Sequence, residues 1–529
     1  MQILQIGKLD WRSQVQEWPD HLDWQFVLPD KASITAYISQ KEKELLEATQ
    51  IRSTEKEALK PEKLHFAAII LTSPLAEDLL EPLSDTVEAY ALLQVSGLGL
   101  KAQSKTGIFH RKVLTELPAF ATPSETVDYL SQVIFDGQYG ETLPIHHGQV
   151  NPELAVTSNY HGHVGLEISG KFSDDYQQLL TYTYNLTNPG HPIELWQQYV
   201  KTNGDLRLRL EVTPINQMGL LELDQTFYFD EVAMQAPCFL PKRDKEILSY
   251  AVSLSVKGFG TVILGDLHWR FSHKELGTLV LGGKRIRDKQ RQDLFYYFNP
   301  GNLKPPLCVY FAGYRPAEGF EGFGMMKAMG HPFLLVADPR LEGGAFYIGS
   351  TEIEAKLQGV IQEALDYLSF DYHDVILSGI SMGTYGALYY AAQVRPYAVV
   401  IAKPFTDLGD TVTNLKLTRP DEFETISDVL VNVSQGRQTL SPAQLNQRFW
   451  DNFSQSDFTR TTFAIAYMQQ DDYDRHATER LLEHLAQKQV HIYTKGFEGR
   501  HNDQNGPIIQ WFLKQYQTLL ADGYERRQQ

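Results

Sequence analysis

The pattern of apolar and polar residues changes character along the chain, and its last part alternates two kinds of segment. Continuous apolar runs such as Leu307–Phe311 and Phe333–Ala337 are typical of parallel strands that are covered on both faces. Between them, Thr351–Leu368 has its apolar residues at helical spacing on one face. This alternation predicts a doubly wound α/β sheet over residues 291–529.

The middle of the chain, residues 148–290, shows a different period. Residues 206–212 and 252–256 alternate strictly between apolar and polar, as strands with one wet face do. Turn residues, for example at 202–205, separate these from other short strand-like runs, and many short strands at this spacing predict a β-sandwich. The other runs are 163–168, 180–186, 225–229, 260–264 and 267–271.

Aromatic residues of the predicted sandwich allow two interpretations. Trp196, Tyr199 and Trp269 would stack on sugar rings if exposed, which would make this a carbohydrate-binding domain. Packing in a core is the commoner role of such side chains. The pattern alone leaves both interpretations open.

Residues 1–147 mix strand-like and helical stretches, and this predicts an N-terminal α/β domain. The expected elements are strands at Gln2–Ile6 and 66–72 and helices at 41–60 and 125–135. His146 and His147 are neighbours at its end, but adjacent histidines do not share a helix face and no carboxylate is suitably spaced. We therefore expect no metal there.

Composition narrows the class of protein. The chain has 529 residues, too many for one core, and a net charge of −17, which argues against nucleic acid as the main partner. The basic run Lys284–Arg287 is interpreted as a solvated linker. The chain has no apolar run of membrane-spanning length and no secretory signal pattern. We therefore expect a cytoplasmic protein with at most peripheral membrane association.

The cysteines predict neither a disulfide nor a metal site. Cys238 and Cys308 lie in apolar surroundings and lack the spacing of metal ligands, so both are expected to be buried thiols. We expect no tightly bound cofactor.

The candidate chemistry starts at Gly379-Ile-Ser381-Met-Gly383, which matches G-x-S-x-G. A short buried strand over 374–378 precedes it and a helix over 384–393 follows it, the context of the nucleophile elbow of α/β-hydrolases. The elbow holds its serine in a strained conformation, so side chains two residues before and after it would clash. Ser381 is therefore the predicted nucleophile.

A serine nucleophile needs a base and an orienting carboxylate, which follow it in the chain in the order acid, histidine. His501 lies between the last predicted strand and the last helix, where the base is required. Asp471, the first carboxylate after the strand 462–467, is the predicted acid. Asp472 and Asp474 in the same loop, and Asp407 after the preceding strand, are the alternatives.

The oxyanion hole requires two N–H donors that converge on the reacting oxygen. Met382, directly after the serine, is the first predicted donor. The second should come from the loop after Leu307–Phe311, at Gly313 or Tyr314. Arg315 in this loop either contacts an anionic or carbonyl part of an acyl donor or forms a structural ion pair.

Longer motifs carry a resemblance to a known family. The motifs lie at residues 257–270, 378–386, 401–405, 466–474 and 499–502. On these motifs the chain resembles the second of the accessory secretory proteins of the accessory Sec system of streptococci, staphylococci and lactobacilli. The resemblance covers most of the chain.

The resemblance implies a cytoplasmic protein that works with the two sister accessory secretory proteins and with the accessory Sec motor and channel in exporting glycosylated serine-rich-repeat adhesins. It also implies an acetyltransferase that acts on N-acetylglucosamine of the adhesin. Ser381 and His501 carry over directly as triad members, and the acid carries over to Asp471. The acetyl donor is unknown, and acetyl-CoA is one candidate. An esterase that delivers the acyl group to water and a non-catalytic export scaffold are the alternatives.

Overall fold

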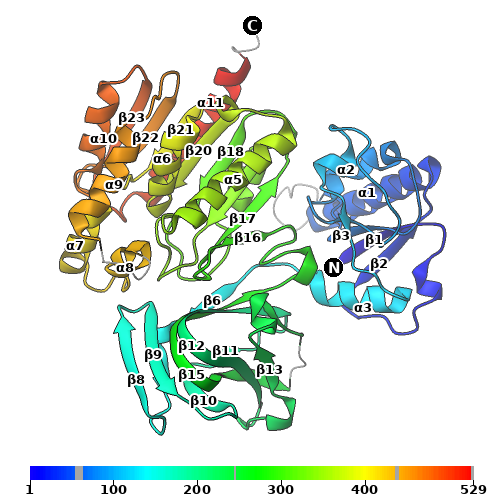
Figure 1. Ribbon diagram of the computed structural model, residues 1–529. Helices are drawn as coiled ribbons and strands as arrows, with labels where there is room; N and C mark the ends of the chain where they lie inside the picture. Colours follow the sequence, from blue (N-terminus) through cyan, green and yellow to red (C-terminus); the bar gives the residue numbers. More distant parts are fainter. Residues whose placement is uncertain (54–62, 243–245, 435–439, 526–529) are drawn as a thin grey trace. The chain divides into compact units, whose positions relative to one another are not determined.

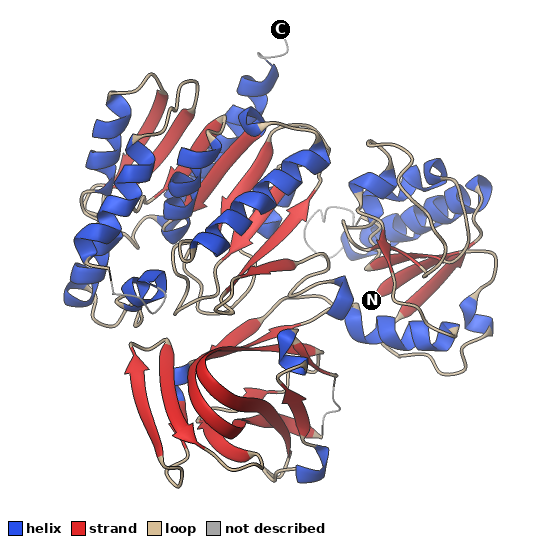
Figure 2. Cartoon of the chain, viewed as in Figure 1, coloured by secondary structure: helices blue, strands red, loops and turns tan. Residues whose placement is uncertain are grey.

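The computed structural model describes residues 1–53, 63–242, 246–434 and 440–525. It belongs to the mixed α/β class, as predicted (Figures 1 and 2). It divides into two compact units. The first unit comprises residues 1–137, 272–283 and 299–303, and the second comprises residues 138–271, 284–298 and 304–529. Within the described parts of the chain, none of the helices is long and apolar enough to cross a bilayer.

The first unit is built on a five-stranded parallel sheet with the order β2-β1-β3-β4-β5. Alternate residues of its central strands face two separate cores: Leu4 and Ile6 pack in one, and Ile3 in the other. The strands are β1 (Gln2–Ile6), β2 (Asp23–Val27), β3 (Ala68–Leu71), β4 (Leu92–Gln94) and β5 (Thr115–Glu116), and the helices are α1 (Lys31–Ser53), α2 (Ile108–Arg111) and α3 (Pro123–Val133).

Helix α1 begins ten residues before the predicted start at residue 41. The carboxylate of Asp30 accepts the backbone N–H of Ser33 at 2.9 Å, which caps the helix at this earlier point. The predicted C-terminal end, residues 54–60, lies outside the described residues.

The β domain of the second unit is one ten-stranded sheet rather than the predicted pair of stacked sheets. Its two long strands, β12 (Ile193–Asn216) and β15 (Ile247–Phe271), pair antiparallel over almost their whole length, and the sheet curls around a single core. The others are β6 (Gly140–Leu143), β7 (Gly148–Val150), β8 (Val156–His161), β9 (Gly165–Lys171), β10 (Gln177–Tyr182), β11 (Leu186–Thr187), β13 (Phe227–Asp230) and β14 (Cys238–Leu240).

The predicted turn at 202–205 is wrong, because these residues continue β12. Gly204, with φ +78°, pairs with Gly260, with φ +141°, and a Cβ on Gly204 would lie 2.4 Å from the Cα of Gly260. The glycines let the two strands bend together and approach closely, which replaces a turn by a kinked strand. For the same reason the runs 252–256, 260–264 and 267–271, predicted as separate strands, are one strand.

The C-terminal domain is built on an eight-stranded sheet with the order β16-β17-β19-β18-β20-β21-β22-β23, in which the strands from β18 to β23 are parallel. Tyr310 packs against Phe512 of α11, and its neighbour Phe311 packs against Tyr390 of α6, so helices cover both faces. The strands are β16 (Lys284–Arg287), β17 (Asp293–Asn299), β18 (Leu307–Phe311), β19 (Phe333–Ala337), β20 (Val375–Ile380), β21 (Ala398–Ala402), β22 (Thr462–Met468) and β23 (His491–Phe497).

The helices of this domain lie between its strands in sequence and after the last one. They are α4 (Phe323–Ala328), α5 (Thr351–Leu368), α6 (Met382–Val394), α7 (Leu408–Thr418), α8 (Asp428–Ser434), α9 (Pro442–Ser454), α10 (Ala477–Ala486) and α11 (Asn505–Glu525). Among the residues that the structure describes, short 3-10 helices lie at Trp11–Ser13, Glu77–Thr86, Ile145–His147, Leu223–Gln225, Ala233–Gln235, Lys274–Leu276 and Tyr372–Asp374.

The strand pairing places two domain boundaries elsewhere than predicted, namely those at 147/148 and 290/291. Strand β6, which precedes residue 148, pairs with β15 of the β domain. Strand β16, which precedes residue 291, pairs with β17 of the C-terminal sheet. The basic run Lys284–Arg287 is therefore an edge strand and not a linker, and its Arg285 forms an ion pair with Glu194 at 2.5 Å.

Candidate active site

Ser381 occupies a sharp turn between β20 and α6. Its backbone has φ 54° and ψ −124°, a conformation that residues other than glycine rarely adopt. A Cβ on Gly379 would lie 2.4 Å from the backbone of Gly383, and one on Gly383 would lie 2.1 Å from the carbonyl oxygen of Phe311. Both glycines are therefore required for the turn to form, as the G-x-S-x-G pattern predicts.

The structure brings Ser381, His501 and Asp471 into one chain of hydrogen bonds. The hydroxyl of Ser381 lies 2.7 Å from Nε2 of His501, and Nδ1 of His501 lies 2.9 Å and 3.1 Å from the two carboxylate oxygens of Asp471. In the tautomer that these contacts favour, the serine donates to Nε2 while Nδ1–H donates to the aspartate. This is the arrangement of a nucleophile, a base and an orienting acid.

The alternative acids have other partners. Asp472 accepts the backbone N–H of His501 at 3.1 Å and forms an ion pair with Arg419. Asp474 accepts the N–H groups of Thr406 and Asp407 at 2.8 and 2.7 Å. Asp407 is fully buried and pairs with Arg480 and with the indole N–H of Trp450.

Burial raises the pKa of Asp474 to about 7, helped by the nearby charges of Asp407 and Asp471 and opposed by its two backbone hydrogen bonds. A buried carboxyl that titrates near neutral pH thus lies beside the proposed acid. It makes the ionisation of this region sensitive to pH.

The imidazole of His501 is held between aromatic rings. Its ring stacks on that of Tyr473, with the centroids 4.1 Å apart and an angle of 5° between the planes. The centroid of the Phe405 ring lies 5.3 Å from that of the imidazole. His501 is only 1% exposed. The packing fixes the ring plane, so that Nε2 points at the serine and Nδ1 at the acid.

A cavity of about 320 Å³ opens at Ser381. Its wall combines apolar side chains with carboxylates, and among the described residues that line it there is no lysine or arginine. The lining residues are Tyr314, Glu342, Phe346, Ser381, Met382, Phe405, Thr411, Leu415, Asp421, Glu422, Phe423, Tyr473 and Asn502.

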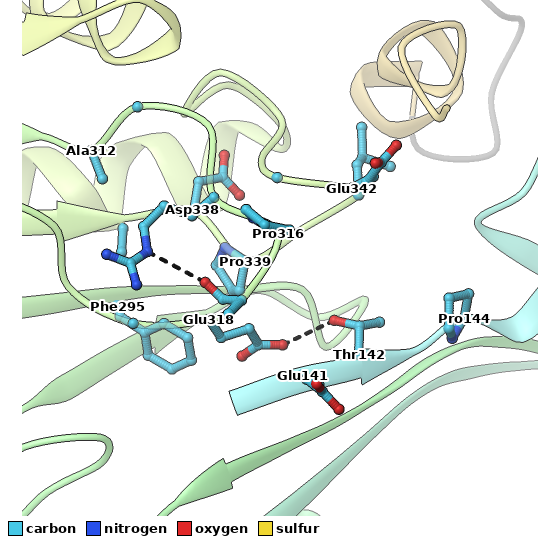
Figure 3. A pocket seen from close by; sticks show the side chains of 17 residues that line it. Glu141, Thr142, Pro144, Phe295, Ala312, Pro316, Glu318, Asp338, Pro339 and Glu342 are labelled. Carbon is cyan, nitrogen blue, oxygen red and sulfur yellow. Dashed lines mark hydrogen bonds between the residues drawn. The ribbon is translucent and has the colours of Figure 1, made fainter. Parts of the chain in front are cut away.

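The predicted oxyanion donors differ in their surroundings. Met382 and Tyr314 line the serine cavity, and Met382 is the first residue of α6. The backbone N–H of Gly313 instead donates to the carboxylate of Glu321 at 2.5 Å. Arg315 lines a neighbouring cavity of about 280 Å³, which Figure 3 shows.

Residues 421–423 form one side of the serine cavity, and no sequence motif indicated them. Asp421, Glu422 and Phe423 line the cavity, and the ring of Phe423 contacts those of Tyr314 and Phe346 at 5.7 and 6.1 Å. Glu342 accepts the backbone N–H of Glu424 and the hydroxyl of Tyr314. This segment is thereby tied to the loop that carries Tyr314.

The aromatic residues considered for sugar stacking are buried, so that interpretation is wrong. Trp196, Tyr199 and Trp269 are 1%, 7% and 2% exposed. The guanidinium of Arg291 lies over the rings of Trp196 and Tyr199 at 3.9 and 4.5 Å. Tyr199 and Trp269 belong to the core of the β domain, and the Arg291 guanidinium covers Trp196 and Tyr199.

The histidines and cysteines considered for metal binding have the following surroundings. The rings of His146 and His147 lie 4.1 Å apart, and among the residues that the structure describes no cluster of three metal-ligating side chains occurs. Cys238 and Cys308 are free and buried, as predicted. Burial raises the pKa of both thiols to about 12.

Comparison with known proteins identifies the family. The family model described as the accessory Sec system GspB-transporter matches residues 1–526. The second accessory secretory protein of the accessory Sec system of Streptococcus gordonii is 34% identical over 531 residues, which covers 100% of this chain and 99% of the relative. The protein of the same name from Staphylococcus aureus is 40% identical over 401 residues, or 75% of this chain and 76% of the relative.

A solved structure agrees with these matches. A chain of the glycosylation-associated protein complex Gap123 from Streptococcus agalactiae is 35% identical to this one, with a TM-score of 0.89 over 99% of this chain and 98% of that chain. The match covers both units. The chain belongs to the family of the second accessory secretory protein of the accessory Sec system.

Proposed function

We propose that the C-terminal domain is a catalytic domain of the α/β-hydrolase type, and that it O-acetylates N-acetylglucosamine on a serine-rich-repeat adhesin. The observation that carries the proposal is the continuous hydrogen-bond chain from Ser381 through His501 to Asp471. A strained serine at an elbow, hydrogen-bonded to a buried histidine that a carboxylate orients, is the arrangement needed for acyl transfer.

The reaction has two half-steps. His501 takes the proton of Ser381 as the hydroxyl oxygen attacks the acyl carbonyl, and it returns that proton to the leaving group as the donor's acyl bond breaks. A sugar hydroxyl then attacks the acyl-serine while His501 takes its proton. Ser381 regains a proton when it leaves, and the acetyl ester remains on the sugar.

The oxyanion formed in each half-step needs N–H donors. We assign them to the backbones of Met382 and Tyr314, because both residues line the cavity that contains Ser381. Gly313 is less suitable, since its N–H already donates to Glu321. The N-terminus of α6 adds a favourable dipole at the same point.

An esterase would use the same triad chemistry with water in place of the sugar. A scaffold role in export would not need the triad. The aromatic wall formed by Phe346, Phe405 and Phe423 favours transfer, since it limits the access of water to the acyl-serine. The acyl donor is unassigned, with acetyl-CoA as one candidate and no tightly bound cofactor expected.

The proposed partners follow from the family. A relative at 35% identity comes from the Gap123 complex, and we propose that this chain likewise works with its two sister accessory secretory proteins. The accessory motor and channel, the glycosylated adhesin and the cytoplasmic location remain predictions.

The proposal is tested by mass spectrometry of the glycans on a co-expressed adhesin. The wild-type protein should add acetyl groups to N-acetylglucosamine, and Ser381→Ala should abolish them. Ser378→Ala is a matched control, because the hydroxyl of Ser378 donates to the carbonyl of Val309 in the core, away from the cavity. Unchanged acetylation with Ser381→Ala would refute the proposal, whereas export without acetylation in the wild type would favour a scaffold.

A further inference from the structure

A second cavity adjoins the serine cavity and has no role in the two half-steps. It is about 280 Å³ in volume, and strand β6 of the β domain faces the loops that follow β18 and β19 across it (Figure 3). The charged side chains that line it are those of Glu141, Arg315, Glu318, Asp338 and Glu342.

Tyr314 and Glu342 separate the two cavities. Glu342 lines both, and it accepts the hydroxyl of Tyr314 at 2.8 Å. Gly343 must lack a side chain, because a Cβ there would lie 2.1 Å from the ring of Tyr314. A ligand in the second cavity therefore lies directly beside the residue assigned as an oxyanion donor.

Buried ion pairs make the floor of the second cavity rigid. Glu318 accepts from Thr142 at 3.0 Å, as Figure 3 shows, and also pairs with His268 and Arg270. Arg270 in turn binds Asp293 at 2.8 Å, and both are fully buried. These carboxylates already have their counter-charges and would not attract a further cation.

The carboxylates on the other side of the second cavity, those of Asp338 and Glu342, also have hydrogen-bonding partners already. Asp338 pairs with Arg340 at 2.6 Å and accepts the backbone N–H groups of Ala345 and Tyr347. Both oxygens of Glu342 accept hydrogen bonds, from Tyr314 and from Glu424. The cavity is preorganised, and few of its polar groups remain available to a ligand.

Arg315 is the principal available donor. Its guanidinium forms no ion pair with any residue that the structure describes, and its Nε donates only one long hydrogen bond, 3.4 Å, to the carbonyl of Ala317. Glu141 supplies an acceptor, since among the described residues only the side chain of Tyr139 donates to its carboxylate. The ligand must therefore both accept and donate hydrogen bonds.

The charges favour an uncharged ligand. Four carboxylates and one guanidinium line the cavity, so a phosphate or diphosphate bound to Arg315 would be repelled by Glu141 and Glu342. The hydroxyl and amide groups of a sugar match both the donor and the acceptor. The volume is close to the lower end of the range for small-ligand sites, about 300 Å³, which suits a single ring.

We propose that this second cavity is a subsite for the acceptor glycan, which binds one neutral sugar unit through Arg315 and Glu141 while a neighbouring unit, the one to be acetylated, enters the serine cavity. This rests on the proposed function, because it assigns the sugar side of that transfer. It also gives the β domain a role, since β6 supplies Glu141 and Thr142.

The direct test is binding of methyl N-acetylglucosaminide to Ser381→Ala protein, measured by saturation-transfer NMR and calorimetry. Arg315→Gln and Glu141→Gln should each weaken binding about tenfold or more, because each removes a charged hydrogen-bonding partner of the sugar. Arg207→Gln is the matched control, an arginine of the β domain whose side chain is 54% exposed. Melting temperatures establish that each variant is folded.

A transfer assay supplies the second readout. In protein with Ser381 intact, the Arg315→Gln variant should raise the KM for the sugar acceptor about tenfold and change kcat at saturating acceptor much less. Equal sugar affinity in both variants and the control would overturn the assignment. Loss of coenzyme A binding in Arg315→Gln with sugar binding intact would also overturn it, and would make the cavity a donor site.

Failure of the proposed function gives a different result. If the wild type binds the sugar in an Arg315-dependent manner but transfers no acetyl group, the subsite stands and the acetyltransferase proposal falls. If transfer occurs and neither variant alters the acceptor KM, only the subsite falls.

Discussion

Arg419 forms an ion pair with Asp472, and the same carboxylate accepts the backbone N–H of His501, the proposed base. Nε and Nη2 of Arg419 each lie 2.8 Å from Oδ2 of Asp472, while Oδ1 accepts the N–H of His501 at 3.1 Å. Burial acts to raise the pKa of Asp472, but the N–H of His501 and the charge of Arg419 hold it below its usual range. The carboxylate therefore stays ionised at neutral pH and fixes the loop of His501.

Removing this support should slow the chemistry without abolishing it. Arg419→Gln should lower kcat for a small activated ester about tenfold, because His501 keeps its acid but loses a fixed position. Arg500→Gln is the matched control, since Arg500 is next to His501 in sequence and its side chain is 61% exposed. Unchanged kcat in Arg419→Gln would show that the ion pair has no positioning role.

The choice among the acids can be tested in one series of variants. Asp471→Asn should lose about a thousandfold in kcat, by analogy with other triads, because an amide no longer stabilises the charged imidazole. Asp472→Asn and Asp407→Asn should lose far less per folded molecule, since neither carboxylate contacts the imidazole nitrogens. An inactive Asp472→Asn beside an active Asp471→Asn would move the acid by one residue.

Phe423 should control whether the acyl group goes to sugar or to water. Its ring closes the cavity against Tyr314 and Phe346. Phe423→Ala should raise the ratio of hydrolysis to transfer about tenfold by admitting water to the acyl-serine. Phe259→Ala removes a ring that is 56% exposed on the β domain and serves as the control. An unchanged ratio would assign water exclusion to other residues.

Asp474 should make the stability of the domain fall as the pH rises. Its pKa is raised to about 7 in the folded state, so between the unfolded value near 4 and pH 7 the folded protein holds a proton that the unfolded chain has lost. The free energy of unfolding therefore declines as the pH rises across this window. Above pH 7 the whole of this loss is present.

The variant Asp474→Asn keeps an acceptor for the two backbone N–H groups and removes the titration. Its melting temperature relative to wild type should rise by a few degrees between pH 5 and pH 8. Thermal unfolding at a series of pH values measures this, and a constant difference would exclude Asp474 as the titrating group.

The sequence predicted local elements best where one residue pattern decides the backbone. The elbow at Ser381 is set by two glycines that have no room for a side chain, and β18, β19 and α5 coincide with the predicted runs. The β domain was harder, because Gly204 and Gly260 look like turn residues and instead kink paired strands. Whether such a glycine forms a turn or a kinked strand depends on the strand that pairs with it, and that strand lies far away in the sequence.

The surroundings of the site could not be predicted from motifs. Tyr473 stacks on His501, and its neighbour Asp472 binds the distant Arg419. Such contacts depend on how loops from different strands meet, and no single stretch of sequence encodes them. The burial of Trp196 and Trp269 has the same origin, since strand pairing decides which face of a strand is covered.

Labelling with a serine-directed fluorophosphonate shows whether Ser381 is an activated nucleophile. The wild type should be labelled at Ser381, because His501 accepts its proton at 2.7 Å. Ser378→Ala should be labelled like the wild type, while Ser381→Ala should not be labelled and His501→Ala should be labelled far more slowly. Labelling of Ser381→Ala to the same extent as the wild type would exclude Ser381 as the nucleophile.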